Sequence, residues 1–455
     1  MLTLTDIMRL QKEKLMKPLR VKDNTSFDTS VIFNVKNLVK NIINKTLKQL
    51  ESEGVFIFPS AVKNTEDLSS DQMILQFINN KIHTGNVMGF LGYGTERLII
   101  ESRFSNNKNV DYFFRYLLER VLDLPNIVDL ETNASREKQL YSLLLFVFPR
   151  YLSAAIRKGL YKQYINRKCN DCNIKGIIDI PRHLNKNTPF LGKIAYTERV
   201  FSYDNLLTQL VRHTIEMIKG KPYGRNILFN VKEEVKLIIN ATPTYEIYDR
   251  QIVLQSNEKN PIRHAYYKEY LALQRLCLMI LRYQKHEFGR GGQTIFGILF
   301  DGAWLWEEYI NILVKDVFYH PMNKAKTEAQ RLFNNEGKIY PDFISKSDSP
   351  RVIADAKYKP EKNIKSKDYL QLLAYMYRFD AKQGYYFYPE INNKDMLHLK
   401  LNTGSTYENN VTSREDIFVI KLGLQIPKDC DDYDMFVREI QVNEQNFINN
   451  LKATL

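Results

Sequence analysis

Two aspartates and one lysine have the types and the spacing that hydrolysis of a phosphodiester requires. Asp342 follows Pro341, and thirteen residues later Asp355 is followed by Ala356 and Lys357. Carboxylate and backbone carbonyl oxygens are the ligands that Mg²⁺ prefers in proteins. A bound Mg²⁺ polarises a phosphodiester and lowers the pKa of a bound water, and a nearby lysine offsets the charge of the transition state. We therefore expect Asp342, Asp355 and the Ala356 carbonyl to bind Mg²⁺, with Lys357 as the catalytic lysine.

A third carboxylate is expected from a helix that precedes these residues. This helix should run from Asp301, which suits the N-cap position, to about Phe318, and it contains Glu307 and Glu308. Adjacent residues of a helix point about 100° apart, so the two glutamates cannot both face the metal. The apolar pattern of the helix does not decide between them, and both stay candidates.

A further helix is expected over residues 367–378, and it offers a possible second tier of site residues. Gln371 and Tyr375 are four residues apart and therefore share one helix face, which can meet the edge of the active site. An exposed glutamine and a packed tyrosine would explain the same pattern equally well. Glu308 belongs to this second tier if Glu307 is the metal ligand.

A β-hairpin must bring the two aspartates together. Strands are expected over residues 339–345 and 352–358, separated by a turn that contains serine and proline. Side chains alternate along a strand, so Asp355 and Lys357 project from the same face. A last strand begins at Gly384, after the second helix. The order helix, hairpin, helix, strand predicts an α/β core with a mixed sheet.

A surface ion pair between Asp355 and Lys357 is the simplest alternative, and it would contribute only about 0–1 kcal/mol. Asp355, however, directly follows the apolar run Val352-Ile353-Ala354. Burying a carboxylate costs several kcal/mol unless a metal or a partner charge compensates for it. The position of Asp355 therefore favours a metal site over an exposed ion pair.

The first 286 residues follow a different pattern. Residues 54–104 contain short apolar runs broken by glycines and are expected to be β-rich. Residues 110–286 have mostly helical periodicity, with one short strand expected at 174–180. We therefore expect a β-rich and helical adaptor domain at 1–286.

A glycine-rich run, Gly289–Gln293, marks the expected boundary between this adaptor and a nuclease domain at 287–455. Charge changes at the same place. Residues 286–455 contain 22 basic and 24 acidic residues, whereas residues 1–285 contain 43 and 28. The net charge of +13 is therefore concentrated in the expected adaptor.

The densest basic stretch runs from Arg150 to Arg199, with 11 basic and three acidic residues. Tyrosines lie among the basic residues. Basic side chains neutralise phosphates and aromatic rings stack on bases, so this stretch is expected to contact DNA or an acidic protein surface. A solvated basic face is the alternative.

Several classes of protein are excluded by composition. No apolar run approaches the 18–20 residues or so that span a bilayer, and the N-terminus has no apolar signal region. Four cysteines in 455 residues cannot form a disulfide framework, so a cytoplasmic protein is expected. The sequence contains no G-x-x-x-x-G-K-[ST] motif and therefore no P-loop for a nucleotide.

The spacing P-D-x12-D-A-K resembles the signature of the PD-(D/E)XK nuclease superfamily, which implies a C-terminal restriction-endonuclease-like domain. More closely, the chain resembles the McrC family, the nuclease subunit of McrBC-type restriction systems, including LlaJI-like relatives. The segments that carry this resemblance are VMGFLGYGTERLIIESRF, IKGIIDIPRHL, ERVFSYDNLLTQLVRHTIEMI, LFDGAWLWEEYI, YPDFI and IADAKYK. By this resemblance, Glu307 rather than Glu308 is the helix glutamate.

The resemblance also implies a partner. McrC-like chains dock their N-terminal part on a McrB-like AAA+ ring that binds and hydrolyses GTP, and they stimulate it. The implied activity is Mg²⁺-dependent cleavage of foreign double-stranded DNA, at a modified or a specific site. Two alternatives stay open: a regulatory subunit whose nuclease activity is weak or conditional, and a nuclease that acts alone.

Overall fold

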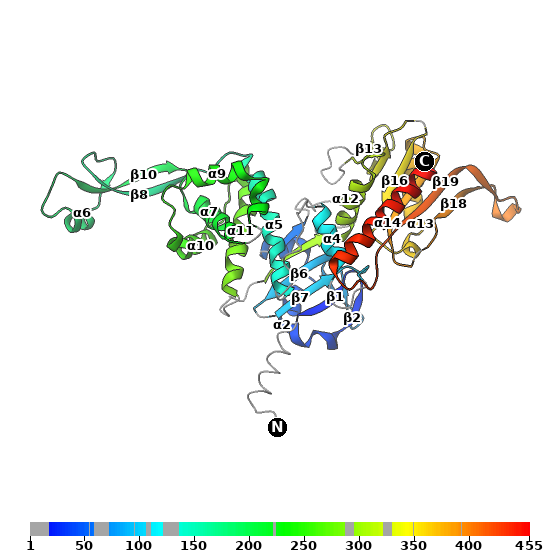
Figure 1. The fold of residues 1–455 in the computed structure, drawn as a ribbon, viewed down its shortest axis with the longest axis horizontal. Coiled ribbons are helices and arrows are strands. Elements are labelled where there is room, and N and C mark those ends of the chain that lie inside the picture. The colour runs from blue at the N-terminus through cyan, green and yellow to red at the C-terminus, as the bar shows by residue number, and fades with distance from the viewer. Residues whose placement is uncertain are drawn as a thin grey trace, which may run out of the picture. The chain divides into compact units, whose positions relative to one another are not determined.

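The computed structural model describes residues 18–53, 55–58, 72–94, 96–105, 111–121, 136–221, 224–286, 295–321, 330–348, 350–392 and 394–455. It divides into two compact units. Unit 1 combines Met1–Ile127 with Gly292–Leu455, and unit 2 is Val128–Gly291 (Figure 1). None of the helices described in these ranges is long and apolar enough to cross a membrane.

The first sheet of unit 1 has five strands. Their order is β1 (Leu19–Lys22), β7 (Glu96–Glu101), β6 (Val87–Tyr93), β11 (Ile295–Asp301) and β3 (Val55–Phe58). Strands β6 and β7 form an antiparallel hairpin, and β1 extends the sheet in parallel to β7. Six of the seven side chains of β6 are buried, which explains its nearly continuous apolar run.

Short elements surround this sheet. A second, antiparallel sheet consists of β2 (Ser26–Asp28), β5 (Lys81–Thr84) and β4 (Leu75–Ile78). The helices of this part are η1 (Thr29–Val35), α2 (Lys36–Ile42), α3 (Leu47–Glu53) and α4 (Tyr112–Val121). One hydrophobic core joins residues of η1, α2 and α3 to residues of both sheets. The described part of residues 54–104 thus contains five strands, β3 to β7.

Strand β11 lies C-terminal to the domain boundary expected between residues 286 and 287, yet it is part of the N-terminal sheet. This strand pairs antiparallel with β6 and parallel with β3, so it belongs to the N-terminal sheet. The compact units therefore divide the chain differently from the expected 1–286 and 287–455, because strand pairing joins segments that are distant in sequence. The glycine-rich run at Gly289–Gln293 lies outside the described residues.

The second large sheet of unit 1 has six strands and is mixed. Their order is β12 (Phe318–Tyr319), β15 (Phe343–Ser345), β16 (Val352–Ala356), β17 (Gln383–Glu390), β19 (Thr412–Gln425) and β18 (Leu397–Thr403). Strands β15 and β16 form the expected antiparallel hairpin, whereas β16, β17 and β19 are parallel. Between β12 and β15 in the chain, β13 (Gln330–Arg331) and β14 (Lys338–Ile339) form a separate two-stranded antiparallel sheet.

Three helices pack around this mixed sheet. They are α12 (Gly302–Val314), α13 (Ser366–Arg378) and α14 (Tyr433–Thr454). Helix α13 contacts β16 and β17, and α14 contacts β19. Asp301 is the N-cap of α12, as expected, because its Oδ1 accepts hydrogen bonds from the amides of Ala303 and Trp304. The chain is therefore a mixed α/β protein with several sheets.

Unit 2 is a helical body from which a hairpin extends (Figure 1). Its helices are α5 (Arg136–Ile156), α6 (Ile180–Lys186), α7 (Leu206–Lys219), α8 (Gly224–Phe229), α9 (Lys232–Ala241), α10 (Arg250–Lys259) and α11 (Lys268–His286), with short 3-10 turns η4 (Ile247–Asp249) and η5 (Ala265–Tyr267). Helix α11 packs against both α5 and α7.

The expectation of a mostly helical segment at 110–286 misses two long strands, at 163–171 and 194–202, whereas the short strand expected at 174–180 overlaps β9 (Ile177–Ile178). Strand β8 (Gln163–Asp171) pairs antiparallel along its whole length with β10 (Ile194–Ser202), and β9 (Ile177–Ile178) adds to β10. Most side chains of β8 are exposed or half-buried. A strand with neither face in a core has no apolar alternation, so periodicity could not show it.

Candidate functional site

Asp355 and Lys357 lie where strand β16 leaves the mixed sheet. Asp355 pairs in parallel register with Tyr386 of β17, and the residue is only 2% exposed. The Nζ atom of Lys357 lies 2.7 Å from Oδ2 of Asp355. The Lys357 amide donates a hydrogen bond of 2.9 Å to the carbonyl of Phe387, which fixes the backbone at this point. The two side chains therefore form a tight, buried ion pair.

Asp342 precedes β15 and reaches the end of β16 across the hairpin. Its Oδ2 accepts a 2.9 Å hydrogen bond from the amide of Ala356. Desolvation raises the pKa of the Asp342 carboxyl well above its usual range, and the negative charges of Glu307 and Asp355 raise it further. Lys357 and the Ala356 amide oppose this rise. Three carboxylates and one lysine therefore share one small region, which we call the acidic cluster (Glu307, Asp342, Asp355 and Lys357).

Helix α12 contributes Glu307 and directs Glu308 elsewhere. Glu307 is buried, and its charge acts on Asp342 more strongly than that of Asp355. Glu308 is half-buried and accepts a 3.1 Å hydrogen bond from the indole of Trp304. The structure thus places Glu307, rather than its neighbour, among the other carboxylates.

His320 also lies at this site, although the sequence did not single it out. Its Nδ1 is 2.8 Å from the carbonyl oxygen of Asp342, and because a carbonyl only accepts, this nitrogen donates. Its Nε2 lies 3.6 Å from Glu307 and 4.0 Å from Glu308. The ring therefore contacts both helix α12 and Asp342, the residue that precedes β15. A lone histidine after a short strand gives no spacing signal, so only the fold could show this contact.

The expected second tier approaches Lys357 from helix α13. The Lys357 ammonium donates a 3.2 Å hydrogen bond to Oε1 of Gln371. The Gln371 amide donates in turn to the hydroxyl of Tyr375, at 2.8 Å. Tyr375 is buried, and Gln371 is half-buried. Both residues therefore belong to a chain of hydrogen bonds that orients the lysine.

The donor chemistry of the acidic cluster suits a hard cation, because its carboxylates repel one another where they are buried. The side chains as they stand are arranged differently from a metal site. Among the described residues, no group of three or more His, Cys, Asp or Glu side chains is placed so that it could hold a metal ion. At Asp355 the ammonium of Lys357 supplies the compensating positive charge.

Comparison with known proteins places the chain in a family. A family model described as "McrBC 5-methylcytosine restriction system component" matches residues 82–389, more than half of the chain. The chain belongs to the McrBC family. This membership confirms the resemblance that the sequence motifs predicted, and the matched span contains the whole acidic cluster. No curated protein matches the chain.

Two solved structures are similar to this McrBC family chain. One is a half-complex from the tetradecameric assembly of Thermococcus gammatolerans McrB AAA+ hexamers with bound McrC. It is 16% identical, with a TM-score of 0.48, over 96% of this chain and 100% of that chain. The other is the cryo-EM structure of the Thermococcus gammatolerans McrBC complex. It is 16% identical, with a TM-score of 0.30, over 66% of this chain and 88% of that chain. At these values neither similarity supports a statement about activity.

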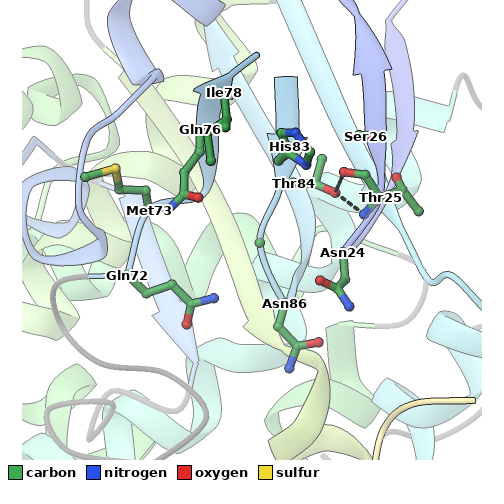
Figure 2. Close-up of a pocket in the computed structure, with 11 residues that line it drawn as sticks. Asn24, Thr25, Ser26, Gln72, Met73, Gln76, Ile78, His83, Thr84 and Asn86 are labelled. Atoms are coloured by element: carbon green, nitrogen blue, oxygen red, sulfur yellow. Dashed lines mark hydrogen bonds between the residues drawn. The ribbon is translucent and has the colours of Figure 1, made fainter. Parts of the chain in front are cut away.

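The McrBC family chain also has a polar pocket in unit 1 that contains none of the acidic cluster. It has a volume of about 460 Å³ and lies beside the sheet of β2, β5 and β4. Figure 2 shows carboxamides around it, and Thr84 within hydrogen-bond distance of Thr25. Its eleven lining residues are Asn24, Thr25, Ser26, Gln72, Met73, Gln76, Ile78, His83, Thr84, Gly85 and Asn86. None carries the acidic or lysine side chains that phosphodiester hydrolysis requires.

Proposed function

We propose that this chain is the DNA-cleaving subunit of a GTP-dependent restriction complex. Its reaction is Mg²⁺-dependent hydrolysis of phosphodiesters in foreign double-stranded DNA, catalysed by a PD-(D/E)XK-type domain. The observation that supports this most is the convergence of Glu307, Asp355 and Lys357 around Asp342, from a helix and a hairpin that are separate in sequence. Membership of the McrBC family points to the same reaction. A cytoplasmic location is part of the proposal.

Each residue of the acidic cluster has a proposed role. Asp342, Asp355, Glu307 and the Ala356 carbonyl would hold Mg²⁺, which when bound polarises the phosphodiester and lowers the pKa of its water. Lys357 orients the attacking water and stabilises negative charge in the transition state. For these tasks the Lys357 ammonium must move partly away from Asp355. The hydrogen bond to Gln371 would hold the ammonium in the site during this movement.

The proposed partner is a McrB-like AAA+ GTPase ring, and unit 2 offers a surface for it. The turn end of the β8–β10 hairpin and helix α6 expose large apolar side chains, each at least 41% accessible to solvent. They are Ile174, Ile177, Ile178, Ile180, Leu184, Phe190 and Leu191. Exposed apolar patches of this kind mark contact surfaces between proteins. In this proposal the partner binds GTP, because this sequence has no P-loop, and this chain binds the ring through the exposed apolar surface.

One observation favours a second candidate, a regulatory subunit with conditional nuclease activity. Oδ2 of Asp355, which a metal ion would use, lies against the Lys357 ammonium. Cleavage then requires a rearrangement of this ion pair, which binding of DNA or of the ring could induce. In that case stimulation of the GTPase would be the main activity of the chain in the absence of DNA.

Asp355→Asn tests the proposed function, because it removes a ligand charge and keeps the shape of the side chain. We expect DNA cleavage by the complex with ring, GTP and Mg²⁺ to fall on the order of a hundredfold to a thousandfold. Stimulation of GTP hydrolysis should stay at the wild-type level.

The matched control is Asp368→Asn, which alters another buried carboxylate of the same domain, one that pairs with Lys359 at 2.7 Å. This variant should lose stability but keep cleavage. Wild-type cleavage by Asp355→Asn would refute the catalytic assignment. An absence of cleavage in the wild-type complex would leave the regulatory candidate.

A further inference from the structure

Tyr358 directly follows the candidate catalytic lysine, yet its side chain packs against the other sheet of unit 1. It is 5% exposed. Its hydroxyl lies 2.7 Å from Oγ of Ser102, just after strand β7, and 3.3 Å from the sulfur of Met88 in β6. Its ring packs edge-on against Phe104, with 5.0 Å between centroids. The residue next to Lys357 is therefore anchored in the N-terminal sheet.

The same ring lies against the start of helix α12, which carries Glu307. A Cβ atom at Gly302 would lie 2.6 Å from Cε1 of Tyr358, so only glycine allows this approach. Helix α12 continues without a loop from β11, a strand of the N-terminal sheet. The ring of Tyr358 therefore lies between the N-terminal sheet and the start of the helix that carries Glu307, and it directly follows Lys357 in the chain.

Buried charges hold this anchor in place. The Arg103 guanidinium lies 4.8 Å from the centre of the Tyr358 ring and forms an ion pair with Asp23, which is fully buried. Asp111 accepts a hydrogen bond from the amide of Ser102. Such a network has few alternative arrangements, because each buried charge needs its partner. The Ser102 hydroxyl is thus a fixed point to which Tyr358 is tied.

We propose that Tyr358 is a positioning residue that couples the N-terminal sheet to the candidate active site. Through its hydrogen bond to Ser102, it sets the position of Lys357 relative to Glu307. A shift of the end of β7 against α12 would therefore move the lysine, so that a change in the N-terminal sheet can control cleavage. The inference rests on the proposed nuclease function for its effect on activity, but the coupling itself can be measured without activity.

Hydrogen exchange of the full-length chain tests the coupling directly. Tyr358→Phe and Ser102→Ala each remove one side of the hydrogen bond. Each should speed amide exchange in residues 352–359 on the order of fivefold, as expected for the loss of about one hydrogen bond. Both substitutions break the same bond, and each also removes one further contact, that of Tyr358 with Met88 or that of the Phe104 amide with Ser102. The double variant should therefore show a smaller increase than the sum of the two single increases.

Tyr385→Phe is the matched control. Tyr385 is fully buried and pairs with Ala354 in the same window, but its hydroxyl donates a 2.8 Å hydrogen bond to Thr454 on helix α14 instead of reaching Ser102. This variant should leave exchange in residues 352–359 unchanged. If Tyr358→Phe and Ser102→Ala also leave it unchanged, or if their effects add in the double variant, the proposed coupling is wrong.

Cleavage by the complex with the ring, GTP and Mg²⁺ gives a second, separate measurement. Tyr358→Phe should lower kcat on the order of fivefold and leave the KM for DNA unchanged, since it touches no substrate. The control should match the wild type. An equal loss in the control would overturn a positioning role. If the wild-type complex does not cleave DNA, the proposed function fails, and hydrogen exchange still decides whether the coupling exists.

Discussion

At the residue scale, Lys357 is the most constrained member of the acidic cluster. Its ammonium contacts Asp355 at 2.7 Å and Gln371 at 3.2 Å, and its side chain is 13% exposed. A compact ammonium can serve both acceptors in so small a space. A guanidinium is planar, larger and fixed in its donor directions, so it cannot take the same position.

Substitution of this lysine should therefore show whether catalysis needs only its positive charge or also the compact shape of the ammonium. We expect Lys357→Ala to lower cleavage on the order of a hundredfold or more. Lys357→Arg should restore little of this loss, although it restores the charge. Cleavage rates of the complex, with melting temperatures to check folding, provide the measurement. Full activity of the arginine variant would show that the site requires only a positive charge.

The two neighbouring glutamates of α12 provide an internal comparison. Glu307 acts on Asp342, whereas Glu308 accepts a hydrogen bond from Trp304. Glu307→Gln should therefore lower cleavage and weaken Mg²⁺ binding, and Glu308→Gln should change either by less than about tenfold. Because both tryptophans of the chain, Trp304 and Trp306, lie within three residues before Glu307, their fluorescence can report Mg²⁺ titration. Equal losses in the two variants would mean that the whole helix turn is required.

At the element scale, helix α7 contains a histidine that makes the stability of unit 2 depend on pH. His213 is 4% exposed, and its Nδ1 lies 3.1 Å from the hydroxyl of Tyr245. Burial, together with the nearby charge of Arg250, lowers the pKa of His213 to about 4. An unfolded chain would bind a proton at this residue near pH 6.5.

The free energy of unfolding should therefore fall as the pH is lowered from about 6.5 to 4. Over that interval the unfolded chain binds the proton and the folded chain does not, and the loss is roughly 3 kcal/mol for this group. Denaturant titrations at pH 7 and pH 5 should measure about 2 kcal/mol of this loss. His213→Gln should reduce the difference between the two pH values. An unchanged pH dependence in His213→Gln would contradict the assignment.

At the scale of the whole molecule, the basic charge lies mostly outside the part that contains the acidic cluster. The stretch from Arg150 to Arg199 belongs to unit 2 and includes the end of α5 and the β8–β10 hairpin. Lys162 lies 4.3 Å from the ring centre of Tyr203, and Lys158 lies 5.5 Å from that of Tyr266. Aromatic rings thus hold some of these cations in place, so they form an ordered basic surface.

Charge reversal of Arg157, Lys158 and Lys162 to glutamate tests whether this surface binds phosphates or the ring. If it binds DNA, the dependence of DNA affinity on salt should become shallower, by about one unit of slope for each lost phosphate contact. If it binds the ring, stimulation of GTP hydrolysis should fall even without DNA. A salt titration of DNA binding and a GTPase assay separate the two.

A control for this variant is available in the same unit. Lys232, Lys236 and Lys259 are exposed, and their reversal changes the net charge equally. Only the first set should affect DNA binding or GTPase stimulation. If both sets behave like the wild type, the basic stretch is a solvated face.

The sequence alone predicted Asp342, Asp355 and Lys357 and the order of the elements around them, whereas its helical pattern left Glu307 and Glu308 both open. Asp342, Asp355 and Lys357 could be found because a hairpin has short-range geometry, and alternation along one strand relates Asp355 to Lys357. The N-cap at Asp301 could be found for the same reason, since a cap bonds to amides two and three residues away. The pair Gln371 and Tyr375 followed from the helical repeat.

The tertiary structure decided what depends on contacts between distant segments. Strand β11 joined the N-terminal sheet, His320 reached Asp342 and Glu307, and Tyr358 reached Ser102, 256 residues away. The β8–β10 hairpin likewise became visible only in the fold, because strands without a buried face have no apolar alternation. Local periodicity records which side of an element is buried, but it does not record which other element covers that side. Pairing partners and anchors are set by packing, and they had to be observed in the structure.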